Sequence, residues 1–159
     1  MNIFYRVDNR LVHGQIISTW MPHLRRKIFV IVNDSAPSNE LQMAMFRMAI
    51  PNDIELKTCT IEDAVPVLNE LKHTQTSVLV LLETVEDAAK LFGAGHAFSM
   101  LNIGNVHHMP GRRSFTNAVF LGDSDLDTLR NLFSRGVHVE IRTLPKEIPI
   151  DLKRAIEAA

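Results

Sequence analysis

The chain has 159 residues, a net charge of -1 and 46% hydrophobic residues. This length suits one globular domain spanning residues 1–159 and is short for two. A net charge this close to zero gives no general attraction to nucleic acid or to an anionic membrane surface. Composition therefore excludes a nucleic-acid-binding class and favours a protein with a single hydrophobic core.

Compartment and membrane insertion can be argued from three features. The single cysteine, Cys59, excludes an internal disulfide and fits a reducing compartment. The N-terminal segment becomes charged at once and lacks the apolar stretch of a signal peptide. The longest apolar run, Val78–Leu82, is far shorter than the ~20 residues of a membrane helix. We expect a cytoplasmic protein that does not enter the membrane itself.

Apolar runs with strand character alternate with amphipathic helical patterns. In chain order, the predicted elements are strand Ile3–Val7, helix Val12–Met21, strand Ile28–Val32, helix Ser38–Ala49, strand Ile54–Cys59, a helix opened by Thr60, strand Ser77–Leu82, a helix opened by Thr84, strands Ser99–Ile103 and Ala118–Leu121, helix Ser124–Arg135, strand Val137–Arg142 and helix Asp151–Ala158.

Local signals support several helix ends. Thr60 and Thr84 each precede a carboxylate by three residues, which is typical of helix N-caps. Ser124 is predicted to cap the next helix, and Gly136 suits the left-handed position after its end. In the second helix the methionines, Met43, Met45 and Met48, are interpreted as core filling.

The alternation of strands and helices predicts an α/β fold. We expect one open, mostly parallel sheet of about seven strands with helices on both faces. The last strand, Val137–Arg142, can be an antiparallel edge strand. Ligands bind such sheets beyond the carboxyl ends of the strands, which directs attention to the segments Asp8–Gln15, Asn33–Ser38 and Gly104–Arg113.

The first of these segments carries the most chemistry. The imidazole of His13 can act as a nucleophile through its unprotonated nitrogen. The fork of Arg10 can hold two phosphate oxygens, and a helix beginning near His13 would add peptide N–H donors. Gly14 allows an anion close to the backbone, and Asp8 could orient the imidazole or hold Arg10. The plainer interpretation is a solvated rim or a local salt bridge.

Other candidates are weaker. His107 and His108 are adjacent, so their side chains point apart in an extended loop, and a zinc site needs three or four converging ligands. They are interpreted as surface loop residues. Cys59 ends a strand without a neighbouring His or Arg and is interpreted as a small core residue.

The run from Arg6 to Ile16, RVDNRLVHGQI, resembles a motif of the IIB subunits of the mannose/fructose/sorbose family of bacterial sugar phosphotransferase systems. Three further stretches also resemble that family, and together they extend the resemblance from residue 3 to about residue 145. These stretches are Val32–Asp34 with the helix that follows, Asn102–Gly104 with Gly111–Arg113, and Ala118–Arg142.

The resemblance implies a protein-N-phosphohistidine–sugar phosphotransferase. His13 would be phosphorylated by a phosphohistidine on a IIA partner and would pass the group to a sugar held by the IIC/IID membrane components. The chain would then be cytoplasmic and peripherally associated with the transporter, with no cofactor and no metal. Arg10 would stabilise the phosphoryl charge and Asp8 would orient the histidine. The remaining residues expected to bind phosphate or substrate are Asn9, Gly14, Gln15, Asn33, Asp34 and Ser35.

One loop departs from the family pattern. Where members commonly carry two glycines and a methionine, this chain has Gly104–Met109 with two histidines, which makes the loop bulkier. Two alternatives stay open from the sequence: a regulatory or degenerate IIB-like binding module without sugar transfer, and a metal-dependent hydrolase using His13, His107 and His108.

Overall fold

The computed structural model describes residues 2–158, in which seven strands form one sheet. The sheet has the order β3-β2-β4-β1-β5-β8-β9, and its strands are β1 (Ile3–Asp8), β2 (Ile28–Val32), β3 (Glu55–Cys59), β4 (Val78–Leu82), β5 (Met100–Asn105), β8 (His138–Ile141) and β9 (Ile150–Asp151). All neighbours are parallel except β8 and β9. The predicted mostly parallel sheet of about seven strands is confirmed.

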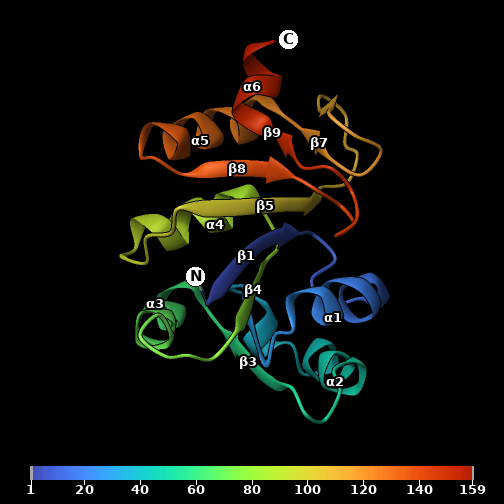
Figure 1. Ribbon diagram of the computed structural model, residues 1–159, viewed down its shortest axis with the longest axis vertical. Coiled ribbons are helices and arrows are strands. Elements are labelled where there is room, and N and C mark those ends of the chain that lie inside the picture. The colour runs from blue at the N-terminus through green and yellow to red at the C-terminus, as the bar shows by residue number, and fades with distance from the viewer. Residues whose placement is uncertain (1, 159) are drawn as a thin grey trace.

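Helices cover both faces of the sheet (Figure 1). They are α1 (Met21–Leu24), which continues a π-helical turn over Ile16–Trp20, α2 (Glu40–Ala49), which follows a 3-10 turn over Ala36–Ser38, α3 (Ile61–Leu71), α4 (Val85–Gly93), α5 (Asp123–Ser134) and α6 (Leu152–Glu157). Strand side chains alternate between two apolar clusters. The larger cluster packs under α3, α4 and α5, and the smaller one packs under the π-helical turn and α2.

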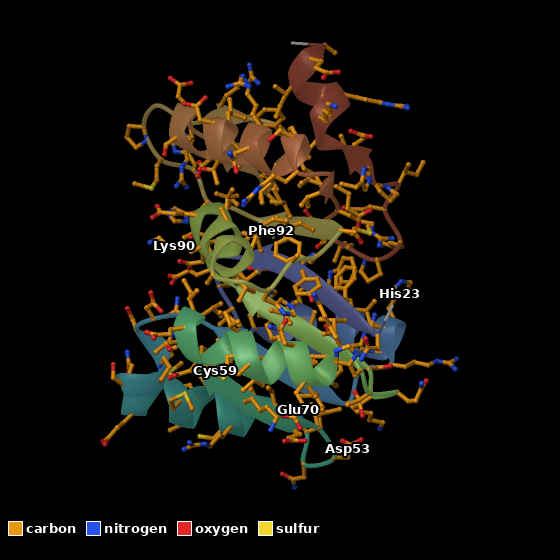
Figure 2. The ribbon with its side chains drawn as sticks, turned by 90° about the vertical axis from the view of Figure 1, so that its left-hand side faces the viewer. His23, Asp53, Cys59, Glu70, Lys90 and Phe92 are labelled. Atoms are coloured by element: carbon orange, nitrogen blue, oxygen red, sulfur yellow. The ribbon has the colours of Figure 1, made fainter. Side chains whose placement is uncertain are left out.

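The face covered by α3 and α4 is turned toward the viewer in Figure 2, where Lys90 and Phe92 lie on α4. Cys59, at the end of β3, is partly buried and packs against the larger cluster. Among residues 2–158, no helix is long and apolar enough to cross a membrane.

Two predicted strands are placed differently from the expectation. The stretch 137–142 does form a strand, β8, but it is parallel to β5 and lies inside the sheet. The antiparallel edge strand is the two-residue β9, which the sequence pattern did not indicate. The other is the stretch 118–121, which leaves the main sheet: β7 (Phe120–Leu121) pairs with β6 (Arg113–Ser114) in a separate hairpin.

Helix ends follow the local signals with one exception. Thr60 and Thr84 accept hydrogen bonds from the backbone N–H groups of Asp63 and Asp87, as N-caps do. Gly136 has the predicted left-handed backbone, with φ of 86°. The Ser124 cap is wrong: α5 begins at Asp123, and the N-cap is Gly122, whose N–H donates to Asp125.

The methionines of α2 do not fill the core as expected: Met43 is half-buried and the other two are exposed. Met45 and Met48 are 60% and 87% exposed, and Leu41 on the same stripe is 73% exposed. The buried residue of this helix is Phe46, which packs in the smaller cluster. Leu41, Met45 and Met48 do lie along one side of the helix, but the helix packs against the sheet through the side that carries Phe46.

Candidate active site

The loop after β1 turns sharply enough to bring its polar side chains back onto the end of the strand. Leu11 adopts a left-handed backbone with φ of 56°, which costs a non-glycine residue roughly 1 kcal/mol. Its side chain is 2% exposed and packs in the smaller cluster, and its N–H donates to the carbonyl of Asp8 at 2.9 Å. Burial of Leu11 offsets the backbone strain and fixes the turn.

Asp8 is the centre of the site and is fully buried. Its Oδ2 lies 2.9 Å from Nη2 of Arg10, 3.0 Å from Nε2 of His13 and 3.2 Å from Nη2 of Arg6. Its Oδ1 accepts from the backbone N and the Nε of Arg10, at 3.1 and 3.0 Å. A buried carboxylate is tolerated only when it is paired and hydrogen-bonded in this way.

The contacts of Asp8 decide its ionisation. Burial alone raises the pKa of this carboxyl, but the hydrogen bonds from His13 and Arg10 and the charge of Arg6 outweigh burial and hold the pKa well below its usual range. Burial lowers the pKa of Arg6 to about 10, against the opposing effect of Asp8. Both groups are therefore charged at neutral pH.

The depressed pKa of Asp8 predicts a loss of stability in acid. The folded-state pKa lies below the unfolded-state value of about 4, so ionised Asp8 stabilises the fold fully above that pH and ceases to do so as the pH falls through the folded-state value. We expect the melting temperature, followed by circular dichroism from about pH 6 to about pH 3, to fall more steeply for the wild type than for Asp8→Asn. Parallel curves would contradict this assignment.

The contact with Asp8 also selects the tautomer of His13. An ionised carboxylate only accepts hydrogen bonds, so Nε2 carries the hydrogen and Nδ1 of the neutral ring keeps its lone pair. Nδ1 lies 3.3 Å from the backbone N of Gln15, which points its hydrogen at that lone pair. The side chain is 15% exposed. His13 thus lies at the start of a helix, with the lone pair of Nδ1 facing the N–H of Gln15.

Arg10 shares the carboxylate of Asp8 with Nε2 of His13 and reaches solvent. Its Nε and Nη2 donate hydrogen bonds to the two carboxylate oxygens of Asp8, and Nη2 also donates to Oε1 of Gln15 at 3.2 Å. The side chain is 36% exposed, and its Nη1 is the nitrogen that these contacts do not use. Gly14, which follows His13, is exposed as well.

Arg6 belongs to the candidate site, although it was not among the site residues predicted from the sequence. Its guanidinium is fully buried and lies over the ring of Trp20, 4.6 Å from the ring centroid. Its Nη groups donate to the carbonyls of Arg142 and Thr143 in the loop after β8. Gly104 leaves the room for it, because a Cβ at that position would overlap the guanidinium carbon. The sequence did contain a signal for Arg6, because a charged residue inside an apolar strand must be paired when it is buried.

Asn9 joins this loop to the loop after β5. Its Oδ1 accepts from Nδ2 of Asn105 at 2.5 Å, which turns its own Nδ2 toward Nδ1 of His107 at 2.7 Å. His107 is exposed, and His108 is exposed and packs edge-on against Phe120. The bulkier loop of this chain therefore contacts the candidate active site directly.

The segment after β2 does not join this cluster by any contact found among the described residues. Asn33 bonds to Glu83 and to the backbone N–H groups of Ser35 and Ala36, while Asp34 accepts from the N–H of Ile61. β2 is separated from β1 by β4, and two strand spacings amount to about 10 Å. Phosphate binding by Asn33, Asp34 and Ser35 stays a prediction.

Metal ligation was the other chemistry considered for the histidines. Across residues 2–158, no three His, Cys, Asp or Glu side chains are grouped so that they could hold a metal ion. The ligand set of the hydrolase alternative is therefore not assembled in this part of the chain.

Comparison with known proteins gives consistent matches over the whole chain. The family described as the PTS system sorbose subfamily IIB component matches residues 2–159. The sorbose-specific EIIB component of Klebsiella pneumoniae is 26% identical over 147 residues, which are 92% of this chain and 90% of that protein. The N-acetylgalactosamine-specific phosphotransferase enzyme IIB component 1 of Escherichia coli (strain K12) is 29% identical over 141 residues, covering 88% of this chain and 89% of that protein. The crystal structure of the IIBSor domain of the sorbose permease from Klebsiella pneumoniae has a TM-score of 0.90 at 26% identity, with coverage of 100% of this chain and 98% of that chain.

Proposed function

Because the chain belongs to the sorbose subfamily of phosphotransferase-system IIB components, we propose that His13 carries a phosphoryl group from a phosphohistidine of a IIA partner to a sugar. IIB components of this system work with IIA and IIC/IID components. In this proposal the protein acts in the cytoplasm, at the transporter formed by the membrane components.

The observation that carries the proposal is the contact of 3.0 Å between Nε2 of His13 and Oδ2 of Asp8. It holds the proton on Nε2 and leaves Nδ1 to attack the phosphorus in line with the departing nitrogen of the donor. The bond from phosphorus to Nδ1 forms as the donor's P–N bond breaks.

Charge on the transferring group is stabilised by the surrounding donors. The equatorial oxygens would face Nη1 of Arg10 and the backbone N–H groups at Gly14 and Gln15. The N–H of Gln15, which now points at Nδ1, becomes a donor to a phosphoryl oxygen once Nδ1 is occupied. No metal is needed, because a guanidinium and a helix start supply positive charge.

The test is phosphorylation by a phosphorylated IIA protein of the same family, followed by intact-mass measurement and site mapping. We expect one acid-labile phosphoryl group, located on His13, and none on His13→Ala. His108→Ala is the matched control, since His108 is exposed and contacts Phe120 outside the cluster. Labelling of His13→Ala at the wild-type level would refute the proposal.

An assay of sugar transfer distinguishes a transporter component from a regulatory module that lacks this transfer. Phosphorylated protein is mixed with membranes that contain IIC/IID components, and the loss of label from His13 is followed with and without sugar. A transporter component loses label faster when sugar is present. A module without sugar transfer keeps its label in both cases.

A further inference from the structure

Three polar side chains lie side by side across neighbouring strands on the face covered by the π-helical turn. Arg6 of β1 is in register with Asn102 of β5, and Asn102 is in register with Glu140 of β8. They are 0%, 0% and 3% exposed. We call these three residues the polar row. Buried groups of this kind are stable only when each of them is hydrogen-bonded.

Hydrogen bonds run along the polar row from one residue to the next. Nη1 of Arg6 donates to Oδ1 of Asn102 at 2.6 Å, and Nδ2 of Asn102 donates to Oε1 of Glu140 at 3.0 Å. A guanidinium can only donate and a carboxylate can only accept. The residue between them must therefore accept on one side and donate on the other, which an amide does.

The polar row ends at the candidate active site. The Nη2 of Arg6 contacts Oδ2 of Asp8, the same oxygen that contacts Nε2 of His13. We propose that Asn102 is a positioning residue for phosphoryl transfer: it holds Arg6 against Asp8, so that Asp8 keeps the His13 ring with Nδ1 unprotonated. This inference rests on the proposed function of His13 and adds a buried residue that touches neither donor nor sugar.

A merely structural role for Asn102 predicts a different outcome. Loss of a buried hydrogen bond would lower the free energy of unfolding and leave the His13 tautomer unchanged. A positioning role changes the tautomer and the transfer rate in a protein that is still folded. The readouts are therefore the ¹⁵N NMR shifts of the His13 ring, which need no donor, and the rate of phosphorylation by phosphorylated IIA.

Asn102→Asp keeps the acceptor for Arg6 but places a second carboxylate against Glu140. We expect Arg6 to move away from Asp8, a mixture of His13 tautomers, and a transfer rate lowered by roughly 10- to 100-fold. Adding Glu140→Gln restores a hydrogen bond between the two positions. The amide then stands at position 140 and donates to the carboxylate at position 102. The double variant is expected to recover the wild-type tautomer and most of the rate.

The control is Asn131→Asp, the same change at an exposed position of α5. Circular dichroism confirms that each variant is folded. Wild-type tautomer and rate in folded Asn102→Asp would overturn the inference. If that variant does not fold, the double variant decides, and a mixed tautomer there also overturns it. Failure of the wild type to take a phosphoryl group on His13 would refute the proposed function instead, while the NMR comparison still decides the role of Asn102.

Discussion

Replacing Asp8 by Asn is expected to lower the rate of His13 phosphorylation by on the order of 10⁴-fold, the loss known for amide replacement of a carboxylate that orients a catalytic histidine. The amide that takes the place of the carboxylate can donate to Nε2, which moves the ring hydrogen to Nδ1 and removes the nucleophilic lone pair. The measurement is the single-turnover rate of transfer from phosphorylated IIA at neutral pH.

The same change is expected to destabilise the fold. Arg6 stays buried and loses its carboxylate partner, which typically costs about 3–5 kcal/mol. Asp127→Asn is the matched control, because Asp127 pairs with Arg130 at the surface, where an ion pair contributes about 0.5 kcal/mol. Urea unfolding of the two variants measures the difference. Equal midpoints, or a normal transfer rate in Asp8→Asn, would contradict the central place given to Asp8.

Gly104→Ala is the second change with a large expected effect. The new methyl group would overlap the guanidinium of Arg6, which is held on its other sides by Trp20 and Asn102. We expect destabilisation by about 3 kcal/mol, from overpacking and from a displaced buried charge. The transfer rate should also fall, because a displaced Arg6 no longer holds Asp8. Urea unfolding and the transfer assay check both effects.

Gly93→Ala is the control for this prediction. Gly93 ends α4, and a Cβ at that position would meet no atom within 4 Å. Alanine is the better helix former, so this variant should be as stable as the wild type or about 0.5 kcal/mol more stable. If Gly104→Ala matched Gly93→Ala in both stability and transfer rate, the close fit around Arg6 would be unimportant.

The sheet and the loop after β1 could be predicted because their signals are local. Ile28–Val32 is an unbroken apolar run, and the structure has a strand with those bounds. Asp8, Arg10 and His13 lie within one short segment, so their convergence needs only one turn. The two-residue β9 was not predictable in this way, since its pairing with β8 depends on the path of the loop between them.

The polar row and the exposed side of α2 depend on long-range packing. Arg6 and Asn102 are 96 positions apart, and only the register of β1 with β5 brings them together. The spacing of Leu41, Met45 and Met48 defines one side of a helix but not the side that meets the sheet. Phe46 occupies that place instead, because the helix is positioned by contacts far away in the sequence.

The pairing of one carboxylate, Asp8, with two guanidiniums bears on how the phosphoryl donor would bind and leave. Arg6, Arg10 and Asp8 together are net positive, and this favours the approach of a doubly charged phosphoryl group. In the proposed relay, transfer to the neutral ring of His13 adds one negative charge to the site, which cancels this positive charge. The emptied donor would then no longer be attracted as its loaded form was, so the loss of positive charge would help to release it before the next protein binds.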